Sequence, residues 1–586
     1  MIKKYSQNYN GIHLIRLGYL LIFIFMMQAL VRPALVGAQV PIPPPAEPGI
    51  IEKSLEQSRP EFQPPPEQKI PEISIDHGRE VIDAGAGPTF LVRRIEIEGN
   101  TVIDNATLAP LIDVGKEGTE MTLGVLNLYA QEVTTFYNTR GYFLARAHFP
   151  PQKIQDGVVK MKIVEGTIGE IRVTGNKRTD SADLIERMEP IKLEKVLREE
   201  TLLRPLLELN DVLGLEVKSV LKPGHAYGTS DLVLHVKESR PYYFAFDVDN
   251  FGSSFTGRTR FGITANVGSL LTFNDLFSVR GVISDGNQDF IQTSYRIPLN
   301  HAGTTFAVAY IYSDYILGKS LTPIDAKGTT NILSFELAQA LHRTRTSQWG
   351  LVLGVDYRFY ENEQLGFVTS EDELVDIFIG VGGNFRDEFL GRNFLNLKLT
   401  QGLKRADPNR TLKSRIGGEG DVLISNLNLI RYQSTQVLKS YFSMQVSGQL
   451  VSSRVLSPDQ FVIGGIGTVR GYPLAEASQD NGYALTLEYV LPFPWKWSVG
   501  FGKTLDKMLS LVGFLDHGRV FVRDPQLGGK NQDLTGAGGG IRIHVPPSNP
   551  SWPALSFACM YGAPVGDPTP SERSNGFLYL SGRISY

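Results

Sequence analysis

The carboxyl-terminal part of the chain consists of segments of about ten residues in which apolar and polar positions alternate. In the last segment, Leu578, Leu580 and Ile584 fall on one face, while Ser581 and Arg583 fall on the other. A period of two is typical of strands whose two faces meet different surroundings. The alternation therefore predicts an all-β region over residues 241–586.

The number of segments indicates what this region forms. They start near residues 242, 259, 275, 290, 304, 330, 349, 376, 393, 421, 440, 482, 509, 534, 553 and 577, which makes about sixteen. Bacterial outer-membrane barrels have even strand numbers, and about sixteen strands enclose an aqueous channel. We therefore predict a transmembrane barrel with apolar side chains facing lipid and polar side chains facing the lumen. A soluble sandwich would show the same alternation with its faces reversed, so the periodicity alone leaves both open.

Two shorter units with a common order of elements precede this region, over residues 89–167 and 168–240. In each unit an alternating strand ends at a Gly-Asn pair, and Gly175-Asn176 lies 76 residues after Gly99-Asn100. An aspartate able to cap a helix follows each pair (Asp104 and Asp180), and a longer amphipathic helix and two more strands come next. The pattern predicts two α+β domains with the order strand, helix, helix, strand, strand.

The amino-terminal residues have the features of an export signal. Lys3, Lys4 and Arg16 precede an apolar stretch over 17–31, and Val36-Gly37-Ala38 offers the small residues that a signal peptidase requires. We predict a cleaved signal peptide over residues 1–38, with a transmembrane anchor as the alternative. Residues 39–88 are rich in proline and predict a linker, in which the proline-free stretch 50–59 can form a short helix.

Composition and charge exclude several classes of function. The 58 Lys and Arg residues against 61 Asp and Glu residues give a net charge of -3, so no basic surface for nucleic acid is expected. Cys559 is the single cysteine, which excludes an intrachain disulfide and a cysteine-rich metal site. Gly318-Lys319-Ser320 lacks the first glycine of a phosphate-binding loop, because Ser313 stands in its place. We therefore expect neither an enzyme nor a cofactor.

One long gap between alternating segments, over residues 453–481, contains candidate chemistry. It combines several glycines with the sequence Val469-Arg470-Gly471-Tyr472. If this loop stays outside the barrel, Arg470 is one more solvated charge. If the loop folds into the lumen, its guanidinium needs an anionic partner. The alternation places Glu488 and Asp516 on the luminal face of neighbouring strands, where they either pair with Arg470 or hydrate the channel.

These residues resemble two motifs of a known superfamily. Residues 469–472 match the VRGY motif in the inward-folded sixth loop of two-partner-secretion transporters, the BamA insertase and chloroplast import channels. Residues 514–518 match the F-x-D-x-G partner of that motif on a barrel strand.

The rest of the chain also resembles this superfamily. The two small domains, with Tyr137 to Tyr142 and the closing Ile163 to Gly166, resemble POTRA domains, which are periplasmic polypeptide-binding modules. Asp249 to Ser253 and Thr256 to Arg258 resemble the TpsB branch, the haemolysin secretion/activation proteins of the ShlB/FhaC/HecB type.

The resemblance implies roles for particular residues. A loop lock would join the two motifs, and its members would be Val469, Arg470, Gly471, Tyr472, Phe514, Asp516 and Gly518. Glu488 would be a further luminal carboxylate, and the helix over 50–59 would plug the lumen. Tyr586 would end the outer-membrane assembly signal that the barrel assembly machinery reads.

The resemblance also implies a function and its partners. The chain would recognise an unfolded TpsA-like exoprotein in the periplasm through its POTRA domains and export it through the barrel without nucleotide hydrolysis, while the outer wall of the barrel contacts outer-membrane lipid. Two POTRA domains favour this function over a BamA-type insertase, whose members usually carry five. A passive porin or adhesin is the third alternative.

Overall fold

The structure, a computed structural model, describes residues 47, 49, 50, 53, 55, 73–75 and 89–586, without residues 116, 404–412, 436, 501, 548, 550, 551 and 573. The predicted signal peptide over 1–38 and most of the predicted linker over 39–88 lie outside these residues. Of the helices in the described part of the chain, none is both long and apolar enough to cross a membrane.

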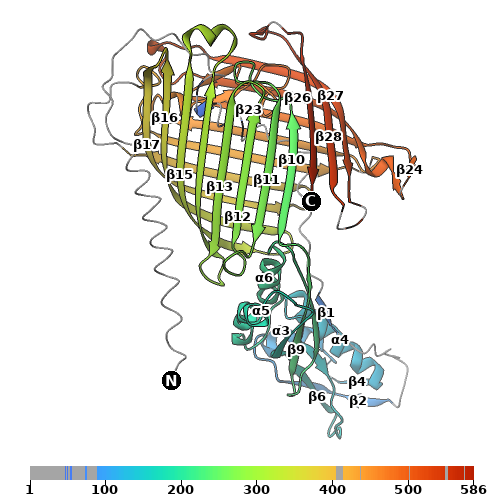
Figure 1. The fold of residues 1–586 in the computed structure, drawn as a ribbon. Helices are drawn as coiled ribbons and strands as arrows, with labels where there is room; N and C mark the ends of the chain where they lie inside the picture. The colour runs from blue at the N-terminus through green and yellow to red at the C-terminus, as the bar shows by residue number, and fades with distance from the viewer. Residues whose placement is uncertain are drawn as a thin grey trace, which may run out of the picture.

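Sixteen antiparallel strands within the described residues close into a barrel (Figure 1). They are β10 (Tyr242–Asp249), β11 (Arg260–Gly268), β12 (Leu276–Ser284), β13 (Gln288–Pro298), β14 (Thr304–Ile316), β15 (Lys327–Arg343), β16 (Ser347–Gln364), β17 (Phe367–Arg386), β18 (Arg392–Gly402), β19 (Leu423–Ser434), β20 (Tyr441–Val451), β23 (Asn481–Pro492), β26 (Leu509–Phe521), β27 (Gln532–Val545), β28 (Ala554–Pro564) and β29 (Phe577–Ser585). The strands follow chain order, and β29 closes the barrel against β10. The prediction of a sixteen-stranded barrel is confirmed.

The two faces of each strand differ as the alternation predicts. On β26, Leu511 and Leu515 are 40% and 48% exposed on the outer face, whereas Val512 and Phe514 between them are buried inside. The chain end takes part in closure, because the Tyr586 N–H donates to the Phe244 carbonyl at 2.8 Å. Apolar side chains therefore cover the outside of the barrel, as a lipid-facing wall requires.

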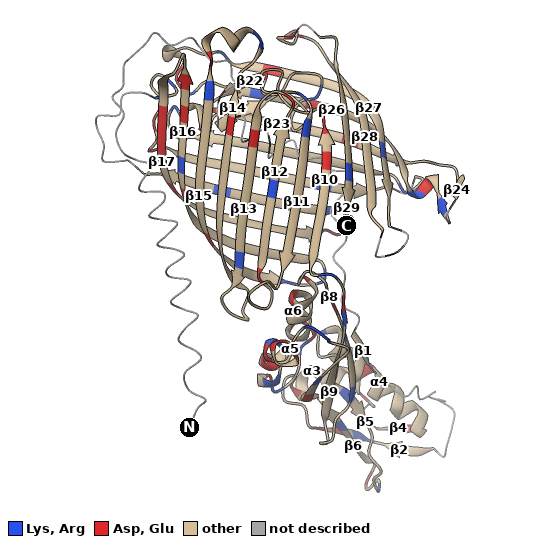
Figure 2. Ribbon diagram, in the orientation of Figure 1, with Lys and Arg blue, Asp and Glu red and all other residues tan. Residues whose placement is uncertain are grey.

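Three strands are longer than the predicted segments of about ten residues. Strands β15, β16 and β17 contain 17, 18 and 20 residues, and β17 begins at Phe367 rather than near residue 376. The extra length of β16 and β17 is acidic, with Glu361 of β16 opposite Glu371 of β17, and Figure 2 shows acidic residues of both strands near their upper ends. A strand of about ten residues already crosses the bilayer, so these ends project into water.

The first unit has the predicted order of elements with two small additional strands. Its elements are β2 (Phe90–Val92), β3 (Arg94–Glu98), α3 (Asn105–Leu108), η2 (Ala109–Leu111), β4 (Thr119–Met121), α4 (Leu123–Thr139), β5 (Arg146–His148) and β6 (Val158–Val164). Helix α4 begins after Thr122, whose hydroxyl accepts the Val125 N–H, and Gly141 follows it with φ +88°. It buries Leu126 and Tyr137 in the core over the sheet β3-β6-β5.

The second unit repeats this order with β7 (Thr167–Thr174), α5 (Ser181–Met188), η3 (Glu189–Leu193), α6 (Glu199–Asn210), β8 (Leu215–Pro223) and β9 (Thr229–Glu238). Its sheet has the order β1-β8-β9-β7, and β1 (Ile73–Ile75) pairs parallel with β8. We did not predict β1, because three residues within the predicted linker are too short for a periodic signal.

The second unit is fixed to the rim of the barrel from which β10 starts. Arg345 in the turn between β15 and β16 donates to Glu199 at 2.6 Å, and Arg343 pairs with Asp211. Arg204 of α6 donates to the Ala302 carbonyl in another turn at 2.8 Å. The unit therefore lies below the barrel, against the rim that these turns form (Figure 1).

Candidate functional site

The longest extracellular connection, between β20 and β23, folds into the barrel. It contains η5 (Ser457–Asp459), β21 (Phe461–Ile463) and β22 (Ala477–Gln479), and the two strands pair as a short hairpin. Most of its side chains are buried. The structure thus places the loop over residues 453–481 in the lumen.

The tip of the loop is held to the wall by a buried ion pair. Arg470 Nε and Nη2 donate to Asp516 Oδ2 and Oδ1 at 2.7 and 2.8 Å, and the Arg470 N–H also donates to Oδ2 at 3.0 Å. The guanidinium carbon lies 3.5 Å from the centre of the Phe514 ring. Arg470 is 3% exposed and Asp516 0%. This geometry is the bidentate form that suits arginine, and it leaves neither charge unpaired.

Glu488 is the second carboxylate at the tip. It accepts from Arg470 Nη1 and, at 2.9 Å, from Arg542 Nη2 on β27. The structure therefore brings together all three predicted charges and adds Arg542, whose position on the polar face of its strand was visible in the alternation.

The remaining predicted residues shape the contact between loop and wall. Gly471 has φ +98°, and its N–H donates to the Tyr579 hydroxyl at 3.1 Å. That hydroxyl donates to the Tyr472 carbonyl at 3.3 Å. Val469 packs over Gly518, where a Cβ would lie 2.9 Å from its side chain. The absence of a side chain at Gly518 thus permits close approach of the loop.

Glycines on β27 serve the same purpose. A Cβ on Gly536 would lie 1.7 Å from the Arg470 carbonyl oxygen, a distance that no side chain tolerates. The absence of a side chain at Gly536 thus permits the loop to lie directly against β27.

A second charged contact, which we did not predict, holds the stem of the loop. Arg358 on β16 donates to Asp459 Oδ1 of the loop at 2.8 Å and to Asp376 on β17 at 2.6 Å. Compared with the tip, the charges are exchanged, because here the wall carries the arginine and the loop the carboxylate. The alternation could have placed Arg358 and Asp376 in the lumen, but nothing in the sequence marks Asp459 as their partner.

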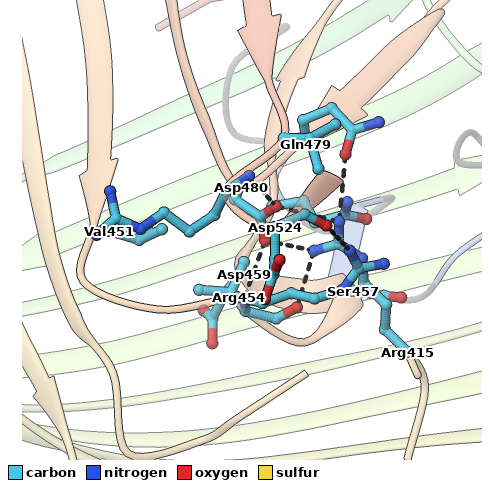
Figure 3. Close-up of polar contacts among 12 residues, drawn as sticks. Arg415, Val451, Arg454, Ser457, Asp459, Gln479, Asp480 and Asp524 are labelled. Carbon is cyan, nitrogen blue, oxygen red and sulfur yellow. Dashed lines mark hydrogen bonds and ion pairs between the residues drawn. The ribbon is translucent and has the colours of Figure 1, made fainter. Parts of the chain in front are cut away.

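Asp480 at the end of the loop joins three extracellular connections (Figure 3). It is 0% exposed and accepts from Arg415, which precedes β19, with one oxygen at 3.2 Å from Nη2. It also accepts the Val455 and Arg523 N–H groups at 3.0 Å each. Nearby, Arg454 donates to the carbonyls of Asp524 and Gly528. The loop is therefore bound to the connection between β18 and β19 and to the connection between β26 and β27.

The described part of the predicted helix over 50–59 lies against this loop. Residues 49, 50, 53 and 55 are helical, while residues 56–59 lie outside the described part. Ile50 is buried beside Val462, and Leu55 is buried in a cluster that includes Leu456. Lys53 Nζ donates to the Gln460 carbonyl at 3.2 Å. The described residues of this helix therefore contact the inward-folded loop from inside the barrel.

Comparisons with known proteins agree with this architecture. The sequence-family model of the haemolysin secretion/activation protein ShlB/FhaC/HecB matches residues 228–543. The family model of the ShlB-type POTRA domain matches residues 90–166. The heme/hemopexin transporter protein HuxB of Haemophilus influenzae is 25% identical over 383 residues, which cover 64% of this chain and 67% of HuxB. The outer membrane transporter CdiB-2 of Burkholderia pseudomallei is 26% identical over 426 residues, which cover 70% of this chain and 69% of CdiB-2.

Solved structures show the same fold. CdiB from Escherichia coli aligns with a TM-score of 0.66 and 20% identity over 87% of this chain and 93% of its own. CdiB from Acinetobacter baumannii aligns with a TM-score of 0.64 and 16% identity over 94% of this chain and 100% of its own. With the family match covering more than half of the sequence, the chain belongs to the haemolysin secretion/activation ShlB/FhaC/HecB family of outer-membrane transporters, with its POTRA region in the periplasm.

Proposed function

We propose that the chain is the translocator of a two-partner secretion system, which captures an unfolded exoprotein in the periplasm and passes it outward through the barrel. The observation that carries this proposal is the filled lumen. A barrel of about sixteen strands has room for an aqueous channel. Here the loop and the described residues of the helix near residue 50 contact each other and the wall through ion pairs and small apolar clusters rather than through covalent bonds. Segments that are held by non-covalent contacts can be displaced by a polypeptide that passes through the barrel.

Capture would begin at the two periplasmic units. Within the described residues, β3 and β5 form the edges of the first sheet, and β7 forms one edge of the second. Strand β1 covers the opposite edge, at β8. An unfolded client can add a strand to an open edge through main-chain hydrogen bonds, which give affinity without requiring one sequence. The second unit, fixed below the barrel, would then deliver the client to the lumen.

The loop lock would keep the barrel closed between transport events. Arg470, Asp516 and Glu488 would hold the loop tip while the helix near residue 50 fills the rest of the opening. Transport would proceed without nucleotide hydrolysis or any enzyme activity, because folding of the exoprotein outside can make export irreversible. Tyr586, at the seam between β29 and β10, would complete the signal by which the barrel assembly machinery inserts the chain.

Secretion by cells tests this proposal directly. The chain would be expressed with a TpsA-like exoprotein from the same genome, and exoprotein in the medium would be measured with and without the two periplasmic units. We expect release that requires both units. If no exoprotein is released and depletion of the chain instead removes other barrels from the outer membrane, the function is that of an insertase.

A further inference from the structure

The periplasmic turn between β23 and β26 is built differently from the other turns of the barrel. It spans residues 493–508, whereas residues 344–346 suffice between β15 and β16. It folds into a hairpin of β24 (Ser498–Gly500) and β25 (Lys503–Thr504), followed by η6 (Leu505–Lys507). In Figure 1 this hairpin projects sideways from the barrel, away from the two periplasmic units.

The hairpin continues the lipid-facing side of β23. Alternate residues of β23 point outward, with Tyr483 37% and Leu487 40% exposed. The same alternation continues past the end of the strand through Phe493, Trp495 and Trp497. The two tryptophans are 58% and 60% exposed. The apolar band of the barrel is thus extended by an aromatic row that leaves the wall.

The three rings pack against one another. Phe493 lies 5.1 Å from Trp495 and 5.5 Å from Trp497, and the tryptophan rings are stacked with centres 6.0 Å apart. The backbone holds them in place, because the Leu505 N–H donates to the Trp497 carbonyl at 2.9 Å. Indole rings favour the boundary between headgroups and acyl chains, where their apolar body and N–H group are both satisfied.

Lysines accompany these rings. Lys496 lies between the tryptophans, and Lys503 and Lys507 follow on the hairpin. Lys503 Nζ donates to the Pro546 carbonyl at 2.6 Å, which ties the hairpin to the next periplasmic turn, where Trp552 is 65% exposed. Lysine at this depth can keep its stem among acyl chains while its ammonium group meets lipid phosphate.

We propose that residues 493–500 and 502–508 form a membrane foot that lies in the interface of the periplasmic leaflet of the outer membrane. Trp495 and Trp497 enter the part of the acyl region next to the headgroups, and Lys496 and Lys507 bind phospholipid phosphates. The foot belongs to the two strands that carry Glu488 and Asp516, so it fixes the depth of the wall sector to which the loop tip binds. This inference depends on the membrane position of the barrel and not on the proposed client.

Fluorescence of the full-length chain in phospholipid vesicles tests the foot. A W349F/W552F variant leaves Trp495 and Trp497 as the emitting residues, since the chain has 4 tryptophans. We expect phospholipid brominated near the headgroup end of its acyl chains to quench this emission, and aqueous iodide to leave it unchanged. Quenching by iodide without quenching by lipid would place the rings in water and overturn the proposal. Protection from both quenchers would place them under protein and overturn it equally.

A lysine variant tests the phosphate contact separately. In the W349F/W552F background, replacing phosphatidylcholine by phosphatidylglycerol should shift the emission to shorter wavelength, because anionic headgroups draw the foot inward. Lys496→Gln with Lys507→Gln should abolish this shift while bromine quenching persists. If the emission wavelength of the W349F/W552F variant is the same in phosphatidylcholine and phosphatidylglycerol, the phosphate assignment is overturned. Heat-modifiable migration of every variant on unboiled gels checks that its barrel is folded.

Discussion

At the scale of single residues, we predict that the buried ion pair between Arg470 and Asp516 keeps the loop against the wall. Arg470→Ala leaves the carboxylates of Asp516 and Glu488 facing a vacated site, and removing one partner of such a pair costs about 3–5 kcal/mol. We expect the loop to leave the wall, which limited proteolysis of the loop and ion conductance of single barrels would both detect. Arg470→Lys keeps the charge but loses the bidentate geometry, so its effect should be intermediate.

An exposed pair on the same wall provides the control. Arg519 and Asp533 pair at 3.2 Å with side chains 41% and 50% exposed. Arg519→Ala should change loop stability by less than about 1 kcal/mol. If Arg470→Ala is as resistant to protease and as poorly conducting as Arg519→Ala, the ion pair does not hold the loop.

The sequence predicts some of these residues and misses others for a physical reason. Asp516 and Glu488 could be assigned to the lumen because strand residues alternate between two faces. Asp459 and Asp480 lie in a loop without a period, and their partners Arg358 and Arg415 are distant in the sequence. Only the folded chain brings such residues together.

At the scale of elements, each of the two periplasmic units has a glutamate whose carboxylate accepts backbone N–H groups just before the first helix of that unit. Glu165 accepts the Thr101 N–H at 2.7 Å, and Glu238 accepts the Arg178 and Thr179 N–H groups at 2.9 Å each. Burial raises the pKa of Glu238, but these hydrogen bonds outweigh it and lower the pKa to about 2.

The lowered pKa predicts acid sensitivity of the second unit. A carboxylate with a lowered pKa in the folded state stabilises that state fully above its ordinary pKa of 4.5, and the contribution is lost as the pH falls toward 2. Amide hydrogen exchange of residues 177–179 should therefore accelerate, beyond its intrinsic pH dependence, between about pH 5 and pH 2. Glu238→Gln should remove this dependence, whereas Glu216→Gln, which breaks only a 4.0 Å contact with Lys237, should retain it. Equal profiles for all three chains would contradict the prediction.

The helix near residue 50 gives an element-scale test of closure. Deletion of residues 41–70 removes the buried side chains of Ile50 and Leu55 from the lumen, so single-barrel ion conductance should rise. Leu55→Asp should have the same direction of effect, because a carboxylate replaces an apolar side chain in a buried cluster. Lys53→Arg, which can still donate to Gln460, should conduct like the original chain. Unchanged conductance after the deletion would show that the segment does not plug the barrel.

Element boundaries were predictable where one pattern dominates. The starts of most barrel strands lie within a few residues of prediction because lipid and lumen impose a strict alternation. Strand β17 begins earlier because its first residues, such as Glu371 and Asp372, stand above the membrane, where polar side chains suit both faces. The pairing of β1 with β8 depends on a sheet edge far along the chain, and a stretch of three residues is too short to predict it.

At the scale of the whole molecule, the second unit lies below the barrel (Figure 1). The loop between β20 and β23 lies inside the barrel, with charged contacts to the wall at its tip and at its stem. The central claim is that an exoprotein replaces this loop and crosses the membrane inside the barrel rather than along its outer wall.

Site-specific photocrosslinking tests that claim most directly. A photoreactive amino acid would replace Val512, which points into the lumen, or its neighbour Leu511, which points to lipid. The exoprotein would be arrested during export by a folded domain at its trailing end. We predict a crosslink to the exoprotein from position 512 and none from position 511. Crosslinks from position 511 alone, with export still active, would contradict passage through the lumen.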